Sequence, residues 1–327
     1  MVFDAQFKFS LKKPRMNCNS LRFWGGLIVG VLMSTVPTQA VVLAFGDGTG
    51  NTTAPPDDPG FANVGDRGVY LGDFSGNHWV LTAFHVGAGS ITLNGSTFGA
   101  VAGTSTRIKN PSGMSLSEFT DLLMFRIDAD PNLPDLSISS TTPAIGSTVT
   151  IIGDGFDREA TQTTWKVNTE VIPHTWDEGG IPPNATGYKS LSSRTMRWGE
   201  NVIIDPGSNE VVNAGFGDAK SINLSFDQAG IANEATYANG DSGGGLFYKN
   251  GSSWELAGIN QATGTFSGQP SDTAVFGNRA FAADLAFYRD EILSVTAVPE
   301  PRIAALFTGI ATLLMASIRR VRRRPSA

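Results

Sequence analysis

Short apolar runs separated by turn residues recur through the middle of the chain, and they constrain its fold more than any other feature. They cover residues 69–71, 79–83, 91–93, 122–127, 148–152 and 256–259. Turn-forming pairs such as Asn94-Gly95 and Asn250-Gly251 separate some of them. Short apolar runs bounded by Gly, Pro and Asn are typical of β-strands. The sequence therefore predicts an all-β barrel or sandwich, and it shows no internal repeat.

One helical pattern follows the last of these runs. Apolar residues recur there at spacings of four, three and four, at Phe281, Leu285, Tyr288 and Ile292. This spacing places them on one face of a helix. We therefore expect a single terminal helix within residues 279–293.

Two stretches show no regular pattern. Residues 46–66 are rich in Gly, Pro, Asp and Thr, which predicts an irregular N-terminal arm. Residues 154–227 are polar, and we expect long loops there.

The N-terminus has the organisation of an export signal. Lys12, Lys13, Arg15 and Arg22 precede an apolar run over 23–36, and Thr38-Gln39-Ala40 follows it. A basic start, a short apolar core and a small-x-small end are typical of a secretory signal peptide. The run is shorter than the about 20 residues that cross a bilayer, which disfavours a membrane anchor. We predict a signal peptide over 1–40, cleaved by signal peptidase after Ala40.

The C-terminus has the organisation of a second targeting signal. Pro299-Glu300-Pro301 leads into an uncharged apolar run over 303–318, and five arginines follow within 319–324. This order resembles the PEP-CTERM sorting signal of Gram-negative bacteria, which an exosortase processes during export. The resemblance implies a sorting signal over 297–327, with a transmembrane segment at 303–318 and a basic tail. The alternative is a plain C-terminal anchor. Either would place the intervening domain outside the cytoplasm, in the extracellular space, at the cell surface or at the outer membrane.

The intervening domain is strongly acidic. Residues 41–298 contain 13 Lys and Arg against 28 Asp and Glu, so their formal charge is 13 − 28 = −15. Such a surface repels phosphate backbones, which argues against a nucleic-acid partner. The only cysteine, Cys18, lies in the signal region. The exported domain therefore has no disulfide and depends on its apolar core.

Three segments carry groups suited to acyl transfer. His85 ends the run Trp-Val-Leu-Thr-Ala-Phe-His, Asp121 opens Asp-Leu-Leu-Met-Phe, and Ser242 lies in Gly-Asp-Ser-Gly-Gly. A serine nucleophile needs a base, a group that orients the base, and N–H groups that face the oxyanion. Asp154 and Asp157 lack the ligand spacing of a known calcium loop. We expect no metal site.

These segments, in the order His, Asp, Ser, resemble the trypsin-like serine proteases of chymotrypsin fold. The resemblance implies two six-stranded antiparallel β-barrels and a C-terminal helix over residues 41–296, and no cofactor. It implies a triad of His85, Asp121 and Ser242, with the N–H groups of Gly240 and Ser242 as the oxyanion hole. A protein or peptide is the implied substrate. Gly245 departs from the pattern, because the family usually has Pro there.

The resemblance also places a specificity pocket. Its base would be Thr236, its wall Gln261, Ala262 and Thr263, and Tyr237 would narrow it. Without a carboxylate at the base, a buried cationic side chain would be unpaired and costly. We therefore expect small or uncharged residues, rather than Arg or Lys, at P1, the substrate position before the cleaved bond.

Asp241 raises the question of activation. In zymogen-type relatives the equivalent Asp pairs with a newly formed α-amino group. Cleavage after Ala40 would expose Val41, so export itself would deliver the activating terminus. The sequence there, Val-Val-Leu-Ala, lacks the Ile-Val-Gly-Gly of the family.

Two other classes of function stay open. One is a catalytically silent protease fold that serves as a binding module, and the other is a structural surface or matrix protein. The first would have lost a triad residue, and the second would show an adhesive or repeated domain without a triad. A lipase is disfavoured, because its nucleophile stands in an α/β pattern.

Overall fold

A computed structural model of the chain describes residues 41–204 and 210–297. The predicted signal peptide, and all but the first residue of the predicted sorting signal with its transmembrane segment, lie outside these residues. Within the described part, no helix is long and apolar enough to span a membrane.

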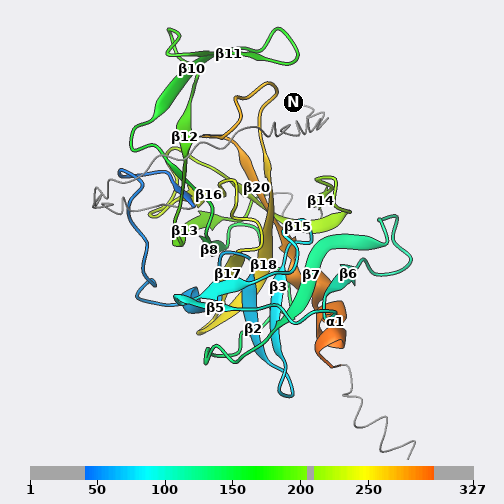
Figure 1. Ribbon diagram of the computed structural model, residues 1–327. Coiled ribbons are helices and arrows are strands. Elements are labelled where there is room, and N and C mark those ends of the chain that lie inside the picture. The colour runs from blue at the N-terminus through cyan, green and yellow to red at the C-terminus, as the bar shows by residue number, and fades with distance from the viewer. Residues whose placement is uncertain (1–40, 205–209, 298–327) are drawn as a thin grey trace, which may run out of the picture.

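Nearly all the regular elements of the described chain are strands, and these pair antiparallel (Figure 1). The strands of the first half are β1 (Val42–Leu43), β2 (Val69–Asp73), β3 (His78–Thr82), β4 (Ile91–Leu93), β5 (Ser96–Phe98), β6 (Thr106–Lys109), β7 (Phe119–Ile127), β8 (Thr148–Gly153), β9 (Phe156–Arg158) and β10 (Thr163–Asn168). The others are β11 (Thr175–Glu178), β12 (Ala185–Arg194), β13 (Arg197–Val202), β14 (Glu210–Val212), β15 (Ala219–Ser225), β16 (Ala235–Thr236), β17 (Gly245–Asn250), β18 (Ser253–Gly264), β19 (Thr273–Val275) and β20 (Arg279–Asp284). A 3₁₀ turn (Phe61–Asn63) and one α-helix, α1 (Leu285–Thr296), complete the set.

The first barrel contains the six strands β2 to β7. Four of them form a sheet in the order β2-β3-β7-β6, and β4 and β5 form a hairpin. A bridge between Ala100 and Ile127 joins the end of that hairpin to β7. The interior holds Tyr70, Val80 and Phe125, which are at most 1% exposed.

The second barrel closes through β13. Its strands follow the order β13-β8-β17-β18-β20-β15, and β14 extends the sheet beyond β15. Where the chain leaves β13, Ile203 bridges to Leu224 of β15, and the Ile204 N–H donates a 3.0 Å hydrogen bond to the Asn223 carbonyl. This contact returns the sheet to its first strand. The fold predicted from the sequence, two antiparallel barrels with a C-terminal helix, is confirmed.

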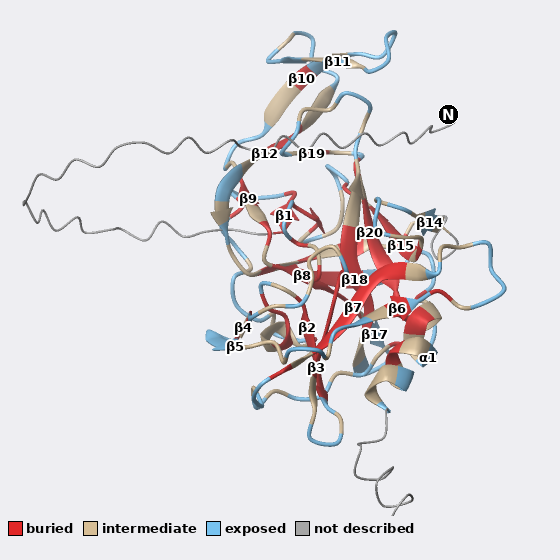
Figure 2. Ribbon diagram, turned by 45° about the vertical axis from the view of Figure 1, so that its right-hand side comes forward, coloured by how far each residue is buried: buried red, intermediate tan, exposed pale blue. Residues whose placement is uncertain are grey.

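The cores follow the predicted apolar runs. All six runs lie on strands whose apolar side chains are largely buried, at β2, β3, β4, β7, β8 and β18. Figure 2 shows the buried residues concentrated where the two barrels and α1 meet. Residues 46–66 form no strand and only the short 3₁₀ turn, as expected of an irregular arm.

The terminal helix starts later than predicted. Phe281 is a strand residue of β20, paired with Asn223 and Ala262 on its two sides. The Asp284 side chain accepts a 3.1 Å hydrogen bond from the Ala286 N–H, which caps α1 at its N-terminus. The helical spacing correctly placed Tyr288 and Ile292, which are fully buried, and wrongly extended the helix over a strand.

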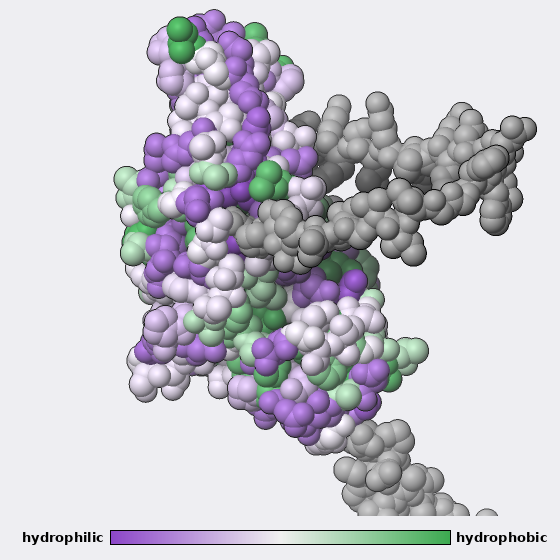
Figure 3. All heavy atoms as spheres, turned by 60° about the vertical axis from the view of Figure 1, so that its left-hand side comes forward, coloured by the Kyte–Doolittle hydropathy of each residue, from purple (hydrophilic) through white to green (hydrophobic). Residues whose placement is uncertain are grey.

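Residues 154–227 are not the long loops that their polarity predicted. Their described part, 154–204 and 210–227, forms seven strands, of which β13 and β15 belong to the second barrel. The strands β10, β11 and β12, together with β19, form a sheet that projects above the barrels in Figure 1. Much of this sheet is exposed on both faces, so its strands lack the apolar alternation that reveals a half-buried strand. On the face shown in Figure 3, hydrophobic residues are scattered among hydrophilic ones.

Candidate active site

His85 and Asp121 are joined by two hydrogen bonds. The His85 Nδ1 lies 2.8 Å from Asp121 Oδ2, and the His85 N–H donates to Asp121 Oδ1 at 3.1 Å. His85 stands in the turn after β3, while Asp121 lies within β7, the neighbour of β3 in the sheet. The Asp121 side chain is 4% exposed and that of His85 is 19% exposed. One edge of the imidazole is therefore fixed by a buried carboxylate.

Ser242 stands in a glycine-rich turn that packs against β3. The Gly243 backbone has φ +89°, and a Cβ atom there would lie 2.5 Å from the Thr82 hydroxyl and 2.7 Å from the Arg67 carbonyl oxygen. Only glycine permits this approach. Because Thr82 ends the strand that leads into His85, the turn of the second barrel touches the segment of the first barrel that carries the imidazole.

Asp241 anchors this turn to the neighbouring backbone at Gly155 and Ala238. It is 1% exposed, and its carboxylate accepts 2.7 Å hydrogen bonds from the N–H groups of Gly155 and Ala238. Burial raises the pKa of Asp241 to about 7, although both hydrogen bonds act in the opposite direction. The residue before the candidate nucleophile is thus fixed at both carboxylate oxygens.

The predicted oxyanion donors lie on the two sides of Asp241. Gly240 has φ +94°, and its carbonyl oxygen accepts a 3.1 Å hydrogen bond from the Arg194 guanidinium. Within the described residues, neither the Gly240 N–H nor the Ser242 N–H donates a hydrogen bond to the protein. Two backbone N–H groups of the serine turn are therefore unpaired within the described residues.

The predicted specificity residues divide into two groups. Thr236 and Gln261 are buried, while Ala262 and Thr263 are half-buried on β18. The Thr236 hydroxyl and the Gln261 Oε1 have no hydrogen-bond partner among the described residues. Tyr237 does not narrow a pocket as expected: it is 4% exposed and packs in the core of the second barrel.

The other two histidines, His78 and His174, pair with no carboxylate among the residues that the structure describes. His78 Nδ1 lies 3.2 Å from the Tyr70 hydroxyl, and His174 Nδ1 lies 2.8 Å from the Val171 carbonyl oxygen. The part of the chain that the structure describes also holds no group of three or more acidic, His or Cys side chains able to bind a metal ion.

A cavity of about 300 Å³ lies between the N-terminal arm and the β4–β5 hairpin. Its lining includes the carboxylates of Asp66 and Asp154, the latter next to Gly155, which donates to Asp241. Burial raises the pKa of Asp154 to about 6. None of the site residues predicted from the sequence lines this cavity.

The sequence did not reveal Phe216. Its ring stacks on the His85 imidazole, with the centroids 4.8 Å apart and the planes inclined by 28°. The one available signal was the pattern Gly-Phe-Gly, an aromatic residue in a turn whose flanking glycines cannot cover it. Periodicity detects no such contact, because the two residues belong to different barrels.

Two antiparallel barrels, with a His–Asp pair on one and a serine in a glycine-rich turn on the other, define the chymotrypsin-like class. The chain belongs to the trypsin family, whose model, described as Trypsin, matches residues 72–281 of the 327 residues. This range includes His85, Asp121 and Ser242.

Two solved structures with a similar fold are human heparin binding protein and neuropsin, a serine protease expressed in mouse brain. The first is 16% identical, with a TM-score of 0.46 over 77% of this chain and 97% of that chain. The second is 18% identical, with a TM-score of 0.43 over 75% of this chain and 97% of that chain. No curated protein matches the chain.

Proposed function

We propose that the protein is an exported serine endopeptidase that hydrolyses peptide bonds with His85, Asp121 and Ser242. The observation that carries the proposal is the 2.8 Å contact between His85 Nδ1 and Asp121 Oδ2. With Nδ1 engaged by the carboxylate, Nε2 is the nitrogen left to take the Ser242 proton and later to protonate the leaving amine. The contact between Gly243 and Thr82 supports the placement of the serine turn beside this imidazole.

The tetrahedral intermediate carries a negative charge on the former carbonyl oxygen, and this charge needs stabilisation. The N–H groups of Gly240 and Ser242 supply it in this proposal, and removing one such donor in a serine protease costs about 10²- to 10³-fold in kcat. The carboxylate of Asp241 fixes the turn between the two donors through Gly155 and Ala238. The site thus requires no cofactor for the proposed reaction.

The P1 residue of the substrate is proposed to be small or uncharged. The Thr236 hydroxyl and the Gln261 Oε1 are buried polar groups with no partner in the described part of the chain, and neither carries a charge. A substrate side chain that offers a hydrogen bond would satisfy them, whereas an Arg or Lys would bury an unpaired cation.

Cleavage after Ala40 by signal peptidase is proposed to activate the enzyme. Val42 pairs with Thr236 at the start of the segment that leads into Asp241. Val41 is 2% exposed and has φ +48°, a conformation that β-branched residues rarely adopt. After cleavage no peptide bond precedes Val41, so the unfavourable φ no longer applies. The new ammonium group would be buried with Val41, and its pairing with the Asp241 carboxylate would favour the ionised form of Asp241.

The destination of the protein is also a proposal. The basic and apolar ends of the sequence support export, exosortase processing and a location at or beyond the outer surface of a Gram-negative cell. The acidic domain supports a protein or peptide substrate rather than a nucleic acid.

A catalytically silent binding module is the alternative to be tested. Incubation of the purified protein with a peptide library should give cleavage products whose formation is lost in His85→Ala and in Ser242→Ala. Binding of peptides without cleavage, unchanged in both variants, would favour the alternative.

A further inference from the structure

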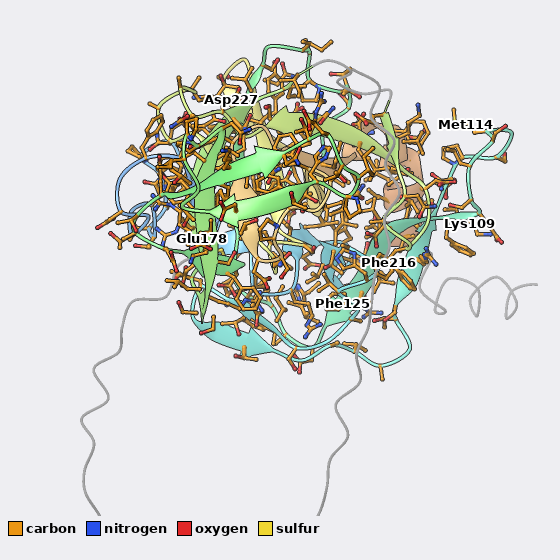
Figure 4. All side chains as sticks on the ribbon, turned by 90° about the horizontal axis from the view of Figure 1, so that it is seen from above. Lys109, Met114, Phe125, Glu178, Phe216 and Asp227 are labelled. Atoms are coloured by element: carbon orange, nitrogen blue, oxygen red, sulfur yellow. The ribbon has the colours of Figure 1, made fainter. Side chains whose placement is uncertain are left out.

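The Phe216 ring covers one face of the His85 imidazole, and the two residues belong to different barrels. Phe216 lies in the turn between β14 and β15 of the second barrel, whereas His85 follows β3 of the first. We call residues 213–218 the strap. Figure 4 labels Phe216 beside the strands of the first barrel, with Lys109 and Met114 further out on the same side.

Arg107 of β6 holds the strap from one side. Its Nη2 donates to the carbonyl oxygen of Phe216, and its Nε donates to the Thr120 carbonyl oxygen at 3.0 Å. The guanidinium carbon also lies 3.8 Å from the centre of the Phe84 ring. Arg107 therefore ties Phe216 to the chain neighbours of both His85 and Asp121.

Asp218 holds the strap at its other end. Its carboxylate accepts a 2.7 Å hydrogen bond from the Ser117 N–H, and its own N–H donates to the Ser117 hydroxyl at 2.7 Å. The Asn110 side chain donates to the Asp218 carbonyl oxygen at 2.9 Å. The strap is thus fastened to the first barrel by polar contacts that do not involve the Phe216 ring.

Glycine allows the strap to approach this closely. A Cβ atom at Gly217, where φ is +108°, would lie 2.2 Å from the Phe119 carbonyl oxygen. Phe216 itself is 38% exposed and belongs to none of the buried core clusters. Its ring is therefore placed against the imidazole by its fastened backbone, rather than by burial in a core.

The imidazole consequently has two restraints of different kinds. Asp121 fixes its Nδ1 edge, and Phe216 fixes one face of its plane. Together they determine the direction of Nε2, the atom that must face Ser242, and precise orientation of a catalytic group is worth large factors in rate. Because the strap comes from the barrel that carries Ser242, it couples the orientation of the base to the docking of the two barrels.

We propose that Phe216 is a positioning residue for the His85 imidazole and that the strap sets the alignment of base and nucleophile across the two barrels. This role rests on the proposed peptidase function, since it concerns the same site. It assigns Phe216 no contact with the reacting atoms.

The test compares the processed protein, which starts at Val41, with its Phe216→Ala and Phe216→Tyr variants. Phe216→Ala should lower kcat by about tenfold or more while KM changes by no more than about twofold, because orientation and not substrate binding is lost. Phe216→Tyr keeps the ring and should restore kcat. Arg107→Ala, which releases the strap and leaves the ring in the sequence, should also lower kcat. Val211→Ala, at an exposed position of the same hairpin, is the matched control and should change nothing.

A second readout needs no activity. Stacking places the Cε1 proton of His85 in the ring current of Phe216, so Phe216→Ala should shift its NMR signal and Val211→Ala should not. An unchanged signal, or an unchanged kcat in Phe216→Ala, would overturn the proposal. A third outcome separates the two proposals. If the wild-type protein cleaves no peptide but Phe216→Ala still shifts the His85 signal, the peptidase function and the positioning role are both wrong, while the stacking of Phe216 on His85 is confirmed.

Discussion

A Cβ atom on Gly243 would lie 2.5 Å from the Thr82 hydroxyl oxygen, which is shorter than the contacts that Cβ atoms make in proteins. Gly243→Ala should therefore displace the Ser242 turn from β3 and lower kcat/KM by about 100-fold or more, since small misplacements in a site have such effects. Peptide hydrolysis and thermal unfolding of the variant measure this.

Gly251→Ala provides the matched control for this substitution. Gly251 also has positive φ, at +62°, but no atom lies within 4 Å of the point that a Cβ atom there would occupy. The control should cost about 1 kcal/mol of stability through backbone strain and leave activity intact. Equal activity in the two variants would contradict the close packing of the serine turn on β3.

The N-terminus should control activity. A protein that starts at Val41 should be more active, by about tenfold or more in kcat, than one that keeps residues before Val41, because only the former has an ammonium group to pair with Asp241. Asp241→Asn should remove the difference. Full activity in the extended protein, with its N-terminus verified by mass spectrometry, would refute activation by export.

Glu234 should make stability depend on pH. It is 2% exposed, and burial raises its pKa from 4.5 to about 7. Between these values the folded state keeps a proton that the unfolded state has lost, so the free energy of unfolding falls as pH rises from about 4.5 to about 7.

Glu234→Gln removes this proton exchange. At pH 8 the variant should be more stable than wild type by an amount on the order of 3 kcal/mol, and near pH 4 the two should differ little. Chemical denaturation at both pH values measures the difference. Glu178→Gln, at an exposed position, is the control. A stability difference between Glu234→Gln and wild type that is equal at the two pH values would be incompatible with the raised pKa.

Thr236 should determine the response to charged substrates. Wild-type protein should cleave after small or uncharged residues in preference to Arg or Lys. Thr236→Asp should improve kcat/KM for Arg substrates by about tenfold or more, since one good charge pairing is worth at least that much. Thr236→Asn is the uncharged control. Preference of the wild type for Arg over Ala in a substrate library would show that the pocket lies elsewhere.

Six strands of the barrels could be predicted, because each carries its own apolar run. The apolar runs of β2, β3, β7 and β8 are buried on the barrel side, and a local pattern suffices to find them. The positions of His85, Asp121 and Ser242 followed from local motifs in the same way.

Contacts between segments far apart in the chain could not be predicted from sequence patterns. Much of the projecting sheet is exposed on both faces and gives no periodic pattern, and Phe281 repeats at a helical spacing although it pairs as a strand. Tyr237 follows Thr236, which the sequence predicts at the base of the specificity pocket, but Tyr237 packs in the core of the second barrel. The stack of Phe216 on His85 depends on how two barrels dock, which no local pattern records.

Labelling with a fluorophosphonate probe tests the central claim most directly. The protein that starts at Val41 should gain one phosphonyl group, located on Ser242 by peptide mass spectrometry, and Ser242→Ala and His85→Ala should gain none. This result would establish an activated serine at the predicted position. A folded protein with a free Val41 that remains unlabelled, or that is labelled equally in Ser242→Ala, would contradict the account.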